Sequence, residues 1–164
     1  PNEPLGSTGT LAVKLLGPEL ANKVVNTLAS FDDGGDNVAV YYNFDQYLYT
    51  EQEDPTQGVG VFGRFGWSRQ NVNPAAHFYS TGVGGKGIIP TRDNDTFGVG
   101  YYFIDLSNDL PAQFHSEQGV ECYYNIQITP WLHVSPDLQV ITNPGGTGTH
   151  DVSVVYGVRM QMNL

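Results

Sequence analysis

The chain has 164 residues, enough for one domain. Seven Lys and Arg residues against seventeen Asp and Glu give a formal net charge of −10, which argues against a nucleic-acid partner because no basic face could neutralise phosphates. Only 15% of the residues are charged, whereas Gly (20) and Tyr (10) are abundant, a composition typical of strands with aromatic faces. The sequence has no apolar run long enough for a transmembrane helix, but alternating strands can cross a membrane without one.

The first 36 residues give a mixed pattern. Residues 11–16 fit a strand, residues 21–30 fit either a helical turn or another strand, and residues 31–36 form an Asp-rich loop. This loop lacks the downstream Glu and the ligand spacing of an EF-hand, so a solvated turn is favoured over a calcium site. We expect residues 1–36 to be a poorly defined region of strand and loop.

Residues 37–164 have a regular pattern, because apolar and polar residues alternate and so predict strands with one apolar and one polar face. The first four such segments occupy residues 38–48, 59–68, 79–86 and 97–103. Polar turns separate them. The Gly84-Gly85-Lys86-Gly87 run lacks the spacing and the Ser or Thr of a phosphate-binding loop, so glycines in a curved strand explain it better.

The fifth segment, residues 120–129, has the most informative alternation. Its apolar positions are Val120, Cys122, Tyr124, Ile126 and Ile128. Its polar positions are Glu121, Tyr123, Asn125, Gln127 and Thr129. A globular interior would need partners for every member of this polar row, whereas a water-filled lumen would not. Cys122, the single cysteine, excludes an intrachain disulfide and is interpreted as a small apolar residue rather than a reactive thiol.

Two further segments complete the pattern. Pro130 and Trp131 predict a tight corner into residues 132–142, which are interrupted at Pro136, and a Gly-rich loop then leads to residues 152–164. Every even position of this last segment is apolar, and a membrane-spanning barrel strand needs about 9–11 residues of such alternation. The sequence therefore predicts about seven strands in an antiparallel meander. Trp67 and Trp131 fall near strand ends, where barrels carry interfacial aromatic residues.

Four stretches of the sequence carry a resemblance to a known family. They are VYYNFDQYL at 40–48, GGKGIIP at 84–90, DTFGVGYY at 95–102 and TPWLHVSPDLQVI at 129–141. In this order they resemble the OprB-type carbohydrate-selective porins of Gram-negative outer membranes. The resemblance covers roughly residues 37–164, whereas the first thirty-odd residues are only loosely similar.

The resemblance implies an all-β, antiparallel transmembrane barrel of about sixteen strands in the bacterial outer membrane. It also implies passive, selective diffusion of monosaccharides and related small carbohydrates, without a cofactor or an energy source. On this interpretation residues 37–164 form C-terminal strands, the chain is the C-terminal half of the porin, and the N-terminal half with its signal peptide is missing. The partners would be small sugars and outer-membrane lipids, and both a monomer and a homo-oligomer stay open. Leu164 departs from the aromatic residue that commonly ends such barrels.

The polar face supplies the candidate site residues. Sugars are held by hydrogen bonds to their hydroxyls and by aromatic faces, so a sugar channel needs charged, amide and Tyr side chains that point into water. Strand parity selects seven residues for such a lumen wall: Arg64, Lys86, Glu121, Tyr123, Asn125, Gln127 and Arg159. The alternative for each is that it only solvates the wall or forms an internal ion pair.

Other chemistry finds little support in the sequence. The four histidines are scattered, with no metal-ligand spacing and no second cysteine, so we expect neither a metal site nor catalysis. A Gly-x-Ser-x-Gly elbow is absent, and the paired carboxylates lie in loops. Two alternatives to a sugar channel stay open: a structural or adhesive outer-membrane barrel without transport, and a soluble lectin-like β-sandwich.

Overall fold

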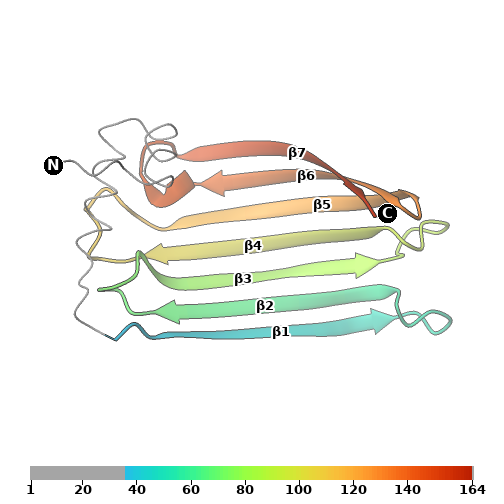
Figure 1. Cartoon of the computed structure of the whole chain (residues 1–164), viewed down its shortest axis with the longest axis horizontal. Coiled ribbons are helices and arrows are strands. Elements are labelled where there is room, and N and C mark those ends of the chain that lie inside the picture. Colours follow the sequence, from blue (N-terminus) through green and yellow to red (C-terminus); the bar gives the residue numbers. More distant parts are fainter. Residues whose placement is uncertain (1–35, 164) are drawn as a thin grey trace.

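The computed structural model describes residues 36–163. The expectations for residues 1–35, which include the strand at 11–16, the alternatives at 21–30 and most of the loop at 31–36, lie outside the described residues, as does Leu164. The described chain forms one antiparallel sheet (Figure 1). Its seven strands are β1 (Ala39–Thr50), β2 (Gly58–Ser68), β3 (Ala75–Lys86), β4 (Thr96–Leu106), β5 (Glu117–Thr129), β6 (Leu132–Thr142) and β7 (Val152–Met162).

Each strand pairs only with its neighbours in sequence, in the order β1 to β7. This order confirms the predicted seven-stranded antiparallel meander. A short 3-10 turn, Pro144–Gly146, lies in the β6–β7 connection. No helix within residues 36–163 is both long and apolar enough to cross a membrane.

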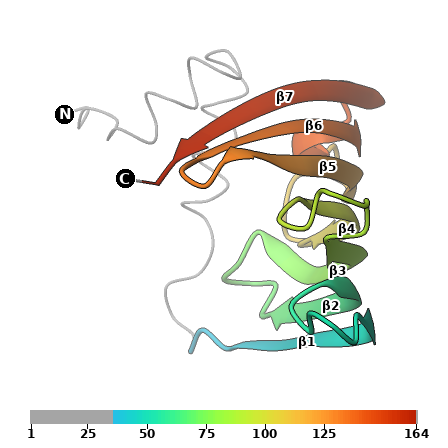
Figure 2. The same cartoon turned by 90° about the vertical axis from the view of Figure 1, so that its right-hand side faces the viewer.

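The sheet is curved and open. In Figure 2 the strands follow an arc from β1 to β7, and β7 bends over the hollow of the arc. Gly82 pairs with Gly100 and Gly84 pairs with Gly98 on the polar face of β3 and β4, so these two strands contribute no side chains of their own to this part of the face. Glycines permit a close approach and a bend that larger residues would resist. Within the described residues, β1 and β7 form the two edges of the sheet.

The register of the strands keeps each face continuous across the sheet. One apolar row crosses six strands through Val61, Val83, Val99, Cys122, Leu138 and Tyr156. On the opposite face, Glu121 pairs with Gly100 and Gln139. Because side chains alternate between faces with a period of two, this register gives all seven strands a common polar face and a common apolar face.

The apolar face is uncovered. Ala76 is the only hydrophobic residue in the described chain that is fully buried, whereas Tyr156 and Val158 are 80% and 76% exposed. Exposed apolar area on this scale is rare on a water-soluble monomer and marks a surface that contacts protein or lipid. The arrangement agrees with the lipid-facing side of a barrel strand, which is apolar and alternates with a polar side.

Two local features differ from the predicted pattern. In β1 the register shifts between Tyr47 and Tyr49, so Leu48 is an extra residue and Tyr49 takes the position opposite Val59 on the apolar face. Strand β6 is not interrupted at Pro136, which pairs with Val158 of β7. The register between β5 and β6 is also the same on both sides of Pro136, and its shift lies further along, between Gln127 and Thr129.

An ion pair between a partly exposed arginine and a buried carboxylate fixes the β3–β4 loop to β5. Arg92 donates to Asp95 through Nε at 2.6 Å and through Nη2 at 2.8 Å, and the Asp95 side chain is buried. Asp95 also accepts hydrogen bonds from the Tyr124 hydroxyl and the Gln127 backbone N–H, both at 2.9 Å. Burial alone would raise the pKa of Asp95, but hydrogen bonds from Arg92, Gln127 and Tyr124 outweigh it and hold the pKa below its usual value.

A charge on the apolar face should cost far more than a charge on the polar face. We expect Leu138→Arg to lower the free energy of unfolding by about 2–4 kcal/mol, because the guanidinium would enter hydrocarbon. The adjacent control, Gln139→Arg, keeps a donor next to Glu121 and should change stability by less than about 1 kcal/mol. Denaturant unfolding of the full-length protein in lipid vesicles measures both. Equal costs would contradict the assignment of the faces.

The Asp95 carboxylate should make the fold sensitive to acid. Its pKa is depressed in the folded state, so its stabilisation is complete above the unfolded value near 4 and is lost as the pH falls through the folded value. We expect Asp95→Asn to lower the free energy of unfolding at neutral pH by about 1–3 kcal/mol, with a difference from wild type that shrinks toward pH 2. Unfolding curves between about pH 2 and 7 test this. Asp93→Asn in the same loop is the control. If the difference in unfolding free energy between wild type and Asp95→Asn did not change with pH, the role given to the Asp95 carboxylate would be wrong.

Candidate functional site

The polar face of the sheet carries all seven residues that the sequence selects for a lumen wall. Glu121, Tyr123, Asn125 and Gln127 follow one another at every second position of β5. Lys86 pairs with Thr96, which in turn pairs with Asn125, so Lys86 shares their face. The pairing of Arg64 with Ser80 and of Arg159 with Ser135 places these two residues on the same face. Their part in binding stays a prediction.

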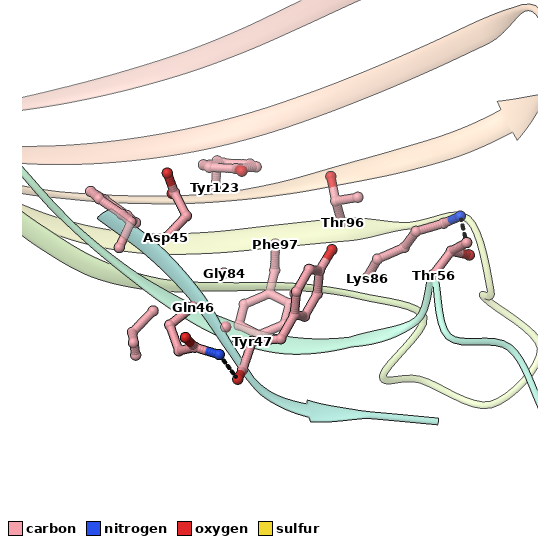
Figure 3. A pocket seen from close by; sticks show the side chains of 13 residues that line it. Asp45, Gln46, Tyr47, Thr56, Gly84, Lys86, Thr96, Phe97 and Tyr123 are labelled. Carbon is pink, nitrogen blue, oxygen red and sulfur yellow. Dashed lines mark hydrogen bonds between the residues drawn. The ribbon is translucent and has the colours of Figure 1, made fainter. Parts of the chain in front are cut away.

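Three hollows lie along this face. The largest, of about 480 Å³, lies between β1 and β5 and is lined by Asp45, Lys86, Thr96 and Tyr123 among others (Figure 3). A second, of about 270 Å³, is lined by Arg64, Glu121 and Tyr123 beside the glycines of β3 and β4. The third, of about 320 Å³, is lined by Thr96, Glu121, Tyr123, Asn125, Ser135, Asp137 and Arg159.

The hollows therefore bring together six of the seven predicted residues. Gln127 does not line any of the three, because it lies further along β5, where its backbone N–H is bound to Asp95. Its side chain shares the polar face, since Gln127 pairs with His133. Tyr123 is common to all three hollows.

Most charged groups of the polar face form only loose contacts. The Lys86 ammonium reaches the Thr56 hydroxyl at 3.4 Å (Figure 3), and Gln139 donates to Glu121 at the same distance. The Arg64 guanidinium lies 5.4 Å from the centre of the Phe62 ring, a cation–π contact. The two salt bridges in residues 36–163 are His77–Asp105 and Arg92–Asp95, so none of the seven predicted residues forms an ion pair within this range.

This combination suits hydroxyl-rich ligands. Arg and Lys donate, carboxylates accept, and Asn does both, so the face can match a polyol that both donates and accepts hydrogen bonds. Asn125 Oδ1 lies 3.1 Å from Nδ1 of His133, which orients the amide. Among the described residues, no group of three or more His, Cys, Asp and Glu side chains could hold a metal ion.

The sequence did not reveal the side chains that lie across glycines. A Cβ added to Gly119 would lie 2.7 Å from Cε1 of Tyr102, and one added to Gly157 would lie 2.7 Å from the Asp137 carboxyl carbon. Each side chain thus occupies the space that a glycine on the neighbouring strand leaves empty. The repeated glycines of the polar face were the available signal, but they predicted only curvature. The sequence also gave no sign of Asp95, because two of its three partners, Tyr124 and Gln127, lie on β5, about 30 residues away.

Comparisons with known proteins agree with this architecture. The family model "Carbohydrate-selective porin, OprB family" matches residues 8–164. Porin B of Pseudomonas aeruginosa is 26% identical over 138 residues, which cover 71% of this chain and 30% of that protein. A solved structure of Pseudomonas putida OprB at high pH aligns with a TM-score of 0.69 at 25% identity. That alignment covers 74% of this chain and 34% of the other, so the matched region spans about a third of each relative's length.

The family match covers nearly the whole chain, and the antiparallel meander has the fold of the solved porin. The sheet also has the two faces that a membrane barrel requires, one apolar and uncovered, the other polar. The chain belongs to the OprB family of carbohydrate-selective porins, which are proteins of the outer membrane.

Proposed function

We propose that this chain forms part of the wall of an outer-membrane channel through which monosaccharides and related small carbohydrates diffuse passively and selectively. The observation that carries the proposal is the division of one curved sheet into two continuous faces. The apolar face is suited to lipid, and the polar face presents charged, amide and phenol groups beside three hollows.

Seven strands in an open sheet cannot sit alone in a bilayer. The outer edges of β1 and β7 would leave backbone N–H and C=O groups without partners in hydrocarbon, where each unpaired group costs several kcal/mol. We therefore expect further strands to pair with these edges and to complete a barrel of about sixteen strands, a size that leaves an aqueous channel. The apolar face would contact outer-membrane lipids, and a homo-oligomer would cover part of it.

Selectivity would come from weak, exchangeable contacts. A hydrogen bond exchanged with water contributes only about 0.5–1.5 kcal/mol net, so a sugar can pass from one group to the next without being trapped. Conduction needs binding that favours entry but permits exit, which several weak sites in series provide. Arg64 and Glu121 line one hollow, and Glu121 and Arg159 line the next. Groups that donate hydrogen bonds to sugar hydroxyls and groups that accept from them therefore follow one another along the wall. Net transport would follow the concentration gradient.

Loss of both charges at one hollow should slow sugar entry more than ion flow. We expect Arg64→Ala combined with Glu121→Ala to slow D-glucose uptake about three- to tenfold, because two hydrogen-bonding groups are lost. Potassium chloride conductance should stay within about twofold, since the net charge of the wall is unchanged. Liposome swelling and planar-bilayer recordings of the full-length protein measure these quantities.

The matched control removes the same two kinds of charge from loops, by Arg69→Ala combined with Asp93→Ala. The control should leave both quantities unchanged. Unaltered glucose uptake in the Arg64/Glu121 variant would show that the assignment of these two residues to the lumen wall is wrong. Failure of the wild-type protein to conduct ions or to admit glucose would favour a structural or adhesive barrel instead.

A further inference from the structure

Tyr123 occupies an unusual position on the polar face. It lines all three hollows, which lie toward β1, toward β3 and toward β7. The residue is 42% exposed, and its hydroxyl forms no hydrogen bond within residues 36–163. A solute that moves from one hollow to another along this wall therefore passes the Tyr123 ring.

Gly98 determines how this ring lies. The two residues are directly paired across β4 and β5, and a Cβ added to Gly98 would lie 2.9 Å from Cζ and 3.0 Å from Oη of Tyr123, and nearer still to Cε1. These contacts place the ring across the β4 backbone. Figure 3 shows the ring nearly edge-on, along the ribbon rather than projecting away from it. Any larger residue at position 98 would displace the ring.

Two other aromatic rings of this face also lie across glycines, but both are engaged. The Tyr102 ring lies over Gly119, and its hydroxyl donates to Glu117 Oε1 at 2.7 Å. Phe62 lies over Gly82, and the Arg64 guanidinium covers its ring at 5.4 Å. Tyr123 has no ring contact and no cation–π partner within residues 36–163, so one face of its ring is available to a ligand.

Polar groups border the free ring. Arg64 and Glu121 line the hollow on the β3 side, while Asn125, Asp137 and Arg159 line the hollow on the β7 side. A pyranose sugar has a face of C–H groups and a rim of equatorial hydroxyls. The C–H face matches the negatively polarised face of an aromatic ring, and the rim matches the surrounding donors and acceptors.

We propose that Tyr123, held flat by Gly98, is a stacking platform for pyranose rings, and that Gly98 is its positioning residue. The inference rests on the proposed sugar channel and deepens it, because it assigns selectivity for a closed sugar ring to one side chain and its glycine support. An open-chain polyol has the same hydroxyl chemistry but lacks the flat C–H face.

The first test distinguishes the contribution of the Tyr123 ring to sugar affinity from that of its hydroxyl. In planar bilayers containing the full-length protein, D-glucose and the open-chain hexitol D-glucitol are titrated, and the reduction of ion conductance gives each apparent affinity. We expect Tyr123→Ala to weaken glucose affinity about two- to tenfold and glucitol affinity less than twofold, because only the closed ring stacks. Tyr123→Phe should keep glucose affinity within about twofold, since it retains the ring face.

The second test changes the support and leaves Tyr123 in place. Gly98→Ala should lift the ring into the hollow, and so weaken glucose affinity as Tyr123→Ala does and reduce ion conductance. Gly66→Ala on the same face is the matched control, because its Cβ would meet nothing closer than 3.6 Å. In the double variant Gly98→Ala/Tyr123→Ala, removal of the displaced ring should restore ion conductance. It should cause no further loss of glucose affinity, as expected for coupled residues.

The outcomes distinguish this platform from the channel itself. Wild-type vesicles that admit glucose no faster than protein-free vesicles would refute the proposed channel. A working channel in which Tyr123→Ala leaves both affinities unchanged would refute the platform alone. If Tyr123→Phe and Tyr123→Ala lowered glucose affinity equally, the Tyr123 hydroxyl would be the binding group, and the stacking proposal would be wrong. A Gly98→Ala variant that behaves like Gly66→Ala would remove Gly98 from the mechanism.

Discussion

The fold depends on the register of its antiparallel ladders. Side chains alternate with a period of two, so a slip of one residue between two strands would move every apolar side chain of one strand onto the polar face. The observed register avoids this across β1 to β7, apart from local irregularities such as that at Leu48. Because Ala76 is the only fully buried hydrophobic residue described, the sheet has no packed core that could correct a slip. The ladders and the surroundings of each face must specify the structure.

Glycine on the polar face links the shape of the sheet to its chemistry. Paired glycines in β3 and β4 leave that part of the wall without side chains, and neighbouring residues extend across it. Tyr123 over Gly98 is one such case, and Asp137 lies in the same way over Gly157 of β7, next to it on the same cross-strand row. A wall built in this way presents aromatic and carboxylate groups without projecting them far. A channel with such a wall can therefore keep its width and still present groups that bind a solute.

The loops take part in this organisation. Asp95 lies just before β4 but binds the backbone of Gln127 and the hydroxyl of Tyr124 on β5, so the β3–β4 loop is tied to the strand that carries the richest polar row. Arg92 neutralises the buried carboxylate, and the resulting hydrogen bonds compensate for its burial. The polar positions of β5 are thus supported at one end by a loop that contributes nothing to the hollows described.

The sequence by itself determined the strands, their order and their faces, because alternation with a period of two is a local property of about ten residues. It also determined that residues such as Arg64 and Arg159 share one face. Only the tertiary structure decided which of them meet. It grouped Glu121 with Arg159, separated Gln127 from the hollows, and laid Tyr123 over Gly98. These contacts depend on the register between strands and on the direction of each side chain, which are set by pairing partners distant in sequence.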